Sequence, residues 1–132
     1  MAVTVTGNDE SNIIRIADFT KADIDGKGGT DVIIINAGED LTIDLRDQSG
    51  TEGSFKNIEG ISITNYKPSN VTLKGDDNDN IFQSGAGDDT VYGYGGNDFI
   101  YVDPGSDIHY GGDGNDTAIS VSYTHLTLPT KA

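Results

Sequence analysis

GDDNDNIFQSGAGDDTVYGYGGNDFIYVDPGSDIHYGGDGND, residues 75–116, repeats a glycine- and aspartate-rich loop at intervals of nine or ten residues. Each copy approximates G-G-x-G-x-D-x-U-x, where U is a large apolar residue. The aspartates that close the loops are Asp79, Asp89, Asp98, Asp107 and Asp116. A fixed period this short predicts a solenoid in which every repeat forms one turn and one short strand.

Short β-branched runs continue this pattern upstream of residue 75. They cover residues 12–16, 31–35, 41–45, 60–64 and 70–73, with one weaker strand expected near Phe55. Clusters of Gly, Asn and Asp, which favour turns, separate them. The apolar residues expected to face the core are Ile33, Ile43, Ile63, Val71, Ile81, Val91 and Ile100. The best helical candidate, residues 18–23, is too short to be stable alone.

These patterns predict an all-β protein, a right-handed parallel β-solenoid or β-roll. We expect irregular, wider coils over residues 1–73 and regular coils of about 18 residues over 74–121, because two nonapeptides close one coil. Residues 122–132 contain neither glycine nor acid and resemble translated vector sequence, so we expect a non-native tail. The open end of the roll is then either covered by this tail or paired end to end with a second molecule.

The charge of the chain is strongly negative, at −14 over 132 residues. Residues 75–116 hold ten aspartates and no lysine, arginine or glutamate. Nucleic acid and anionic membranes are poor partners for such a surface.

Cysteine is absent from the sequence, and no apolar run is long enough to span a membrane. The N-terminal residues do not resemble a secretory signal.

The spacing of the aspartates predicts calcium sites between stacked coils. Coils stack at about 4.8 Å, and calcium binds oxygen at about 2.3–2.6 Å, so one ion can reach two loops. The expected pairs are Asp79 with Asp98, Asp98 with Asp116, and Asp89 with Asp107. We therefore expect about three calcium ions.

Glycine lets backbone carbonyls turn toward such an ion. The glycines expected to contribute are Gly85, Gly87, Gly93, Gly95, Gly96, Gly105, Gly112 and Gly114. Asp31, in GKGGTDVI (26–33), and Asp77 match the motif less completely and are weaker candidates. Loops with oxygen ligands and no cysteine suit calcium better than zinc or copper, and magnesium requires tighter geometry. An EF-hand starting at Asp23 is excluded, because Ile34 stands where the bidentate glutamate is required.

The loops resemble the RTX, or haemolysin-type, calcium-binding repeat. The motif is clearest at residues 84–91 and 93–100 and least complete at 102–109. The resemblance implies a secreted, extracellular bacterial protein that is exported by the type I route and folds in extracellular calcium. We expect a non-catalytic module that couples calcium to the folding of a larger protein. The alternatives are a segment of a polysaccharide- or surface-binding adhesin, suggested by tyrosines at 92, 101 and 110, and a fragment of a β-helix lyase or epimerase.

Overall fold

The computed structural model describes residues 3–16, 22–37, 39–46, 54–65, 69–103 and 105–120, which form parallel β-strands and no helix. Consequently none of them forms a helix that could cross a membrane. The strands are β1 (Val3–Thr6), β2 (Ile13–Ile16), β3 (Ala22–Asp25), β4 (Val32–Ala37), β5 (Leu41–Asp44), β6 (Ser54–Lys56), β7 (Gly60–Asn65), β8 (Val71–Lys74), β9 (Ile81–Gln83), β10 (Thr90–Tyr92), β11 (Phe99–Val102), β12 (Ile108–Tyr110) and β13 (Thr117–Ser120).

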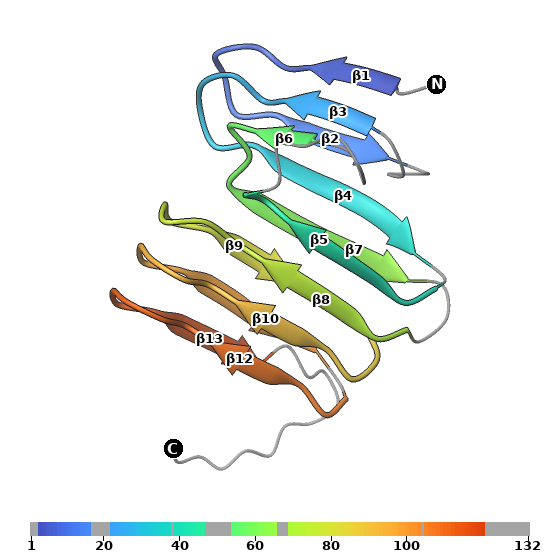
Figure 1. Cartoon of the computed structure of the whole chain (residues 1–132), viewed down its shortest axis with the longest axis vertical. Helices are drawn as coiled ribbons and strands as arrows, with labels where there is room; N and C mark the ends of the chain where they lie inside the picture. The colour runs from blue at the N-terminus through green and yellow to red at the C-terminus, as the bar shows by residue number, and fades with distance from the viewer. Residues whose placement is uncertain are drawn as a thin grey trace.

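The strands form three parallel sheets, and within each sheet successive strands follow one another along the long axis of the molecule (Figure 1). The six-stranded sheet has the order β13-β11-β9-β7-β4-β2, and it extends through every coil. The other two sheets have the orders β1-β3-β6 and β12-β10-β8-β5. Because each strand pairs in parallel with the equivalent strand of the next coil, the chain is an all-β parallel solenoid, as the sequence predicts.

The length of a coil differs along the chain. Hydrogen bonds join equivalent positions that are 19, 28 and 21 residues apart in the upstream coils. Between β9 and β13 the separation is 18 residues. The longest coil contains three strands, β4, β5 and β6, before the chain returns to the six-stranded sheet at β7. The weak strand expected near Phe55 is confirmed as β6.

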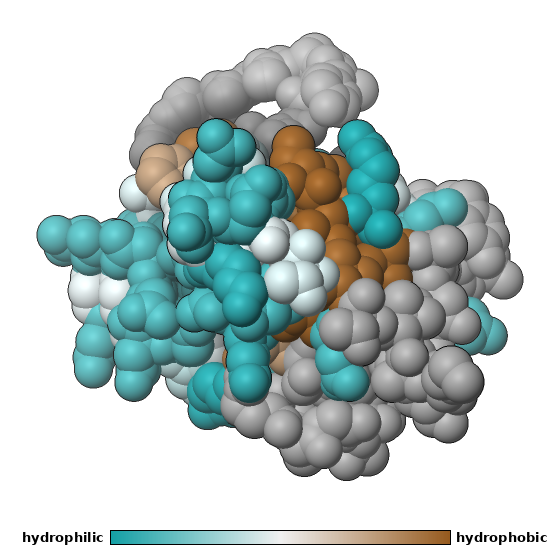
Figure 2. Space-filling view, turned by 90° about the horizontal axis from the view of Figure 1, so that it is seen from above, coloured by the Kyte–Doolittle hydropathy of each residue, from teal (hydrophilic) through white to brown (hydrophobic). Residues whose placement is uncertain are grey.

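The core consists of side chains that alternate inward along each strand. Ile33, Ile61, Phe82 and Ile100 are aligned in the six-stranded sheet and are at most 2% exposed. They face a second aligned row, Ile43, Leu73 and Val91, at most 1% exposed. In an end-on view, hydrophobic residues occupy the middle of the molecule with hydrophilic residues beside them (Figure 2).

One local expectation is wrong. Ile81 was expected in the core, but Phe82 aligns with Ile100 and is fully buried, whereas Ile81 remains partly exposed. The cause is the ten-residue repeat at this point, whose extra residue moves the core position by one. The candidate helix at residues 18–23 was judged too short to be stable, and its described part agrees with this, since Ala22 and Asp23 begin strand β3; residues 18–21 lie outside the described residues.

Candidate metal sites

Six polar residues occupy equivalent positions immediately before the strands of the six-stranded sheet. We call this set the Asp98 column, and its members are Asn12, Asp31, Glu59, Asn80, Asp98 and Asp116. A carboxylate in this column reaches back to the preceding coil. The N–H of Asn80 donates to Asp98 Oδ1 (2.8 Å), and the N–H of Asp98 donates to Asp116 Oδ1 (2.9 Å).

The opposite edge carries a second set of equivalent positions, the Asp89 column: Leu41, Val71, Asp89 and Asp107. The N–H of Val71 donates to Asp89 Oδ1 (2.8 Å), and the N–H of Asp89 donates to Asp107 Oδ1 (2.9 Å). The sequence-predicted pairs Asp98/Asp116 and Asp89/Asp107 are therefore stacked neighbours in adjacent coils.

The second oxygen of several of these carboxylates has no hydrogen-bond partner among the described residues. Oδ2 of Asp31, Asp89, Asp98 and Asp107 is buried without a hydrogen bond. A buried polar atom normally finds a partner, and leaving a carboxylate oxygen unpaired is costly. The pairs thus present acceptors that a cation would satisfy.

Burial also makes the negative charge of these carboxylates unfavourable. It raises the pKa of Asp98 to about 6, and the neighbouring Asp116 carboxylate adds to the effect. Burial likewise raises the pKa of Asp89 to about 6, with a further contribution from Asp107. A cation between the paired carboxylates would remove this penalty, because an opposite charge favours the ionised form.

Glycine allows backbone oxygens to lie between the coils. Gly112 and Gly114 have φ of 84° and 106°, a region that residues with a side chain rarely adopt. A Cβ on Gly112 would collide with the carbonyl oxygen of Tyr94, and one on Gly114 with that of Gly96. Both carbonyls belong to the loop that ends at Asp98, and that of Tyr94 also accepts from the N–H of Asp113 (2.8 Å).

The opposite edge repeats this arrangement. A Cβ on Gly87 would collide with the carbonyl oxygen of Ser69, and one on Gly105 with that of Gly87. Both edges therefore combine two carboxylates with carbonyl oxygens, a donor set that fits calcium. Among the described residues no three acidic, histidine or cysteine side chains gather at one point, so a cation at either edge would need backbone carbonyls or water to complete its ligands.

The remaining predicted glycines also lie in the loops. Gly85 and Gly96 have φ of 84° and 86°. A Cβ on Gly93 would collide with Asp98 Oδ2, and one on Gly95 would be 3.0 Å from the Asp77 carboxylate. Asp77, a weaker candidate, is exposed and belongs to neither column.

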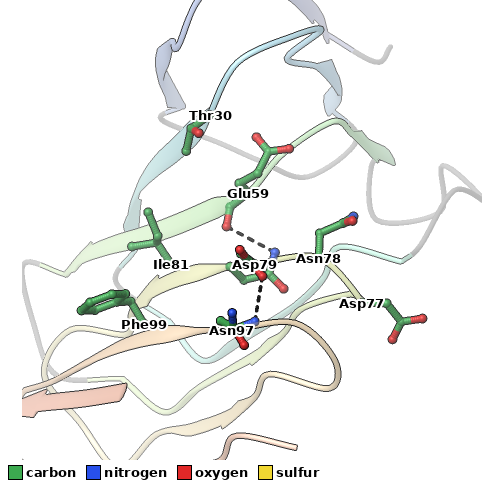
Figure 3. A pocket seen from close by; sticks show the side chains of 9 residues that line it. Thr30, Glu59, Asp77, Asn78, Asp79, Ile81, Asn97 and Phe99 are labelled. Atoms are coloured by element: carbon green, nitrogen blue, oxygen red, sulfur yellow. Dashed lines mark hydrogen bonds between the residues drawn. The ribbon is translucent and has the colours of Figure 1, made fainter. Parts of the chain in front are cut away.

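The predicted pairing of Asp79 with Asp98 is wrong, because Asn80 stands opposite Asp98. Asp79 is exposed, and its Oδ1 accepts from the N–H of Asn97 (2.7 Å) (Figure 3). The buried Asn80 accepts from the N–H of Asp76 (3.0 Å) and donates to the carbonyl of Glu59 (3.3 Å). Counting 18 residues back from Asp98 reaches Asn80, but the ten-residue step from Asp79 to Asp89 leaves both residues possible in the sequence.

An open cavity of about 690 Å³ lies beside these residues, lined by Thr30, Glu59, Asp77, Asn78, Asp79, Asn80, Ile81, Asn97 and Phe99 (Figure 3). On one side the cavity borders the connection between β6 and β7, which consists of residues 57–59 only. The connection between β8 and β9 in the next coil is longer and consists of residues 75–80. Glu59 in this connection is a member of the Asp98 column that the sequence motif did not reveal, because no glycine-rich loop precedes it.

Stacked loops with buried, paired aspartates beside backbone carbonyls define a metal-binding β-roll. Residues 74–108 match the family described as RTX calcium-binding nonapeptide repeat (4 copies). This segment consists of RTX calcium-binding repeats, and the resemblance seen in the sequence is confirmed there. No curated protein and no solved structure gives a significant match to the chain.

Proposed function

We propose that this β-roll couples extracellular calcium to the folding and stability of a larger secreted protein. The observation that carries the proposal is the buried, unpartnered Oδ2 of Asp89, Asp98 and Asp107. Without a cation these carboxylates destabilise the stack. A ligand that binds only the folded chain stabilises it by about 2.7 kcal/mol per site at 100 times its dissociation constant.

Two stacks have complete carboxylate pairs. One site comprises Asp98 and Asp116 with the carbonyls of Tyr94 and Gly96, and the other comprises Asp89 and Asp107 with those of Ser69 and Gly87. In the third expected site Asn80 replaces Asp79, and its side-chain oxygen is already engaged with Asp76. We therefore propose two principal calcium sites among the RTX repeats, rather than the three expected from the sequence.

Circular dichroism tests the coupling. We expect the β-sheet signal and the melting temperature to fall in EDTA and to recover in millimolar calcium, but not in equal magnesium. An unchanged melting temperature with and without calcium would contradict the proposal.

We also propose that the module is non-catalytic. Its paired aspartates accept hydrogen bonds from backbone N–H groups between coils, a role that suits ligands of a structural cation.

We extend the proposal to location. RTX repeats are typical of secreted bacterial proteins, and millimolar extracellular calcium would supply the ion. Export by the type I route would keep the chain unfolded until it reaches calcium. Secretion of the parent protein from cells with and without a type I exporter tests this route. Equal secretion from both strains would exclude it.

One observation supports a second candidate function, binding of a polysaccharide. Tyr92 and Tyr110 stack on one sheet face with ring centroids 5.0 Å apart and planes 10° apart. Tyr94 lies 6.0 Å from Tyr92, and the Arg46 guanidinium lies 4.1 Å above the Tyr94 ring. Because these rings stack on one another, they present their edges and hydroxyl groups, which can form hydrogen bonds with sugar hydroxyls. Affinity electrophoresis in a neutral glucan tests this, and unretarded migration of the calcium-loaded protein would contradict it.

A further inference from the structure

The loop of residues 26–31 lies outside the RTX segment, yet it reproduces the arrangement around Asp98. Asp31 is 0% exposed and Asp98 is 1% exposed. Asp31 Oδ1 accepts from the N–H of Asn12 (2.7 Å), as Asp98 Oδ1 accepts from that of Asn80 (2.8 Å). In both residues Oδ2 is buried and has no hydrogen-bond partner.

The surroundings of the two unpartnered oxygens also correspond. A Cβ on Gly93 would meet both Asp98 Oδ2 and the carbonyl oxygen of Gly111 in the next coil. A Cβ on Gly26 would collide with both Asp31 Oδ2 and the carbonyl oxygen of Asn57, again in the next coil. In each loop a carboxylate oxygen and a carbonyl oxygen therefore converge beside the first glycine.

The conformation of Asn57 holds its carbonyl at this place. Its φ of 54° lies in the left-handed region, which non-glycine residues adopt only where their surroundings favour it. Its side-chain amide donates to Asp25 Oδ1 (2.8 Å) and thereby anchors the residue to the preceding coil.

Asn12 and Asn80 occupy the same position in their loops as Asp31, but their side-chain oxygens accept hydrogen bonds from their own loops. Asn12 Oδ1 accepts from the N–H of Asn8 (3.0 Å), and Asn80 Oδ1 accepts from that of Asp76 (3.0 Å). These loops are closed by their own backbone. Asp31 Oδ2 accepts no such hydrogen bond. A cation bound to this oxygen would take the place of the missing N–H donor.

The nearest base of this loop is directed elsewhere. Lys27 Nζ pairs with Asp25 Oδ2 at 3.4 Å, and no ion pair reaches Asp31 among the described residues. The N–H of Asp31 donates to Glu59 Oε2 (2.8 Å), so a second carboxylate is stacked against this position from the next coil. The local charge is therefore negative and uncompensated.

We propose that the loop of residues 26–31 binds a divalent cation of calcium's chemistry, with Asp31 Oδ2 and the carbonyl of Asn57 among the ligands. This inference rests on the proposed calcium chemistry of the Asp98 column. It extends that chemistry to a site whose aspartate, Asp31, lies 67 residues upstream of Asp98 and that has no complete motif.

The test compares the full chain with its Asp31→Asn variant. Asparagine suits this position sterically, as Asn12 and Asn80 show, and it preserves the acceptor for the N–H of Asn12. We expect the calcium bound per chain, measured by equilibrium dialysis, to fall by one ion. Glu39→Gln removes the same charge from an exposed residue on the other edge and should leave the stoichiometry unchanged.

Hydrogen exchange of the unaltered chain provides a second measurement that does not depend on the variant folding. We expect calcium to slow amide exchange both in residues 22–37 and in residues 84–103. Protection of 84–103 without protection of 22–37 would overturn this inference and leave the proposed function intact. Protection of neither segment would overturn both.

Discussion

The N–H of Asn80 donates to Asp98 Oδ1 across a coil boundary, at 2.8 Å and a separation of 18 residues. This bond fixes one oxygen of Asp98 and leaves the other buried without a partner. The same residue thus anchors the preceding coil and provides an acceptor for a cation. Asp79, adjacent to Asn80 in sequence, is exposed and takes no part in the pair.

Asp98→Asn should lower the calcium stoichiometry and the stability of the calcium-loaded protein. The variant keeps the acceptor for Asn80 but loses the charge shared with Asp116. We expect a loss of about 2.7 kcal/mol at calcium 100-fold above the dissociation constant. Asp79→Asn, the same change of charge on the exposed residue that the sequence had paired with Asp98, tests the register; because the Asp79 charge also raises the pKa of Asp98, we expect a smaller effect and not a null one. Equal effects of both variants in calorimetric titration would contradict the assigned register.

Asn80→Asp should make the fold more dependent on calcium. The variant loses the hydrogen bond from the Asn80 amide to the carbonyl of Glu59. It also adds a negative charge opposite Asp98, in the preceding coil. We expect a lower melting temperature in EDTA and a larger gain on adding calcium than in the unaltered chain. A gain of the same size in both proteins would show that no ion occupies this stack.

Acid should stabilise the calcium-free fold. The pKa of Asp89 and Asp98 is raised from the ordinary aspartate value of 3.8 to about 6 in the folded chain. The folded state therefore binds more protons, and this stabilising contribution is complete below about pH 4 and is lost as the pH rises through 6. Melting in EDTA should occur at a higher temperature near pH 5 than near pH 7.5. The opposite order would contradict the burial of these two carboxylates.

Gly114→Ala should destabilise the last described coil with or without calcium. Its φ of 106° is unfavourable for alanine, and the added Cβ would collide with the carbonyl oxygen of Gly96. We expect a cost of about 1–3 kcal/mol in chemical denaturation. Gly95→Ala is the control, because Gly95 has no positive φ and its Cβ would come no nearer than 3.0 Å to Asp77 Oδ1 and 3.3 Å to Asp77 Cα. A control that costs as much as Gly114→Ala would refute the steric explanation.

Self-association through the last described strands is a further prediction. β12 and β13 end their sheets among the described residues, and they carry Ile108, Tyr110 and Ile119, which are 52%, 51% and 38% exposed. Sheet ends with apolar side chains favour pairing. Light scattering should show association that grows with concentration and is reduced by Ile119→Lys. A chain that remains monomeric at every concentration would exclude end-to-end pairing. The expected role of residues 122–132 in covering this end lies outside the described residues.

Much of the fold and of the site followed from local sequence. Alternation of β-branched and turn-forming residues predicted the parallel solenoid, because each short strand needs a neighbour to bury its apolar side chain. The 18-residue separation predicted that Asp98 stacks with Asp116 and Asp89 with Asp107. The oxygen-rich, acidic loops predicted calcium, since the preference of the ion depends on the type of ligand.

Only the tertiary structure decided the register where the spacing changes. Ile81 and Phe82 are both apolar, and Asp79 and Asn80 are both suited to a loop end, so the sequence permits either alignment. Packing selects Phe82 for the core beside Ile100, and this choice places Asn80 opposite Asp98. The same holds for Asp31 and Glu59, which join the column across 19- and 28-residue separations. Such separations depend on the number of residues that each coil needs before it returns to the same sheet. The packing of the core determines this number, and a local motif does not.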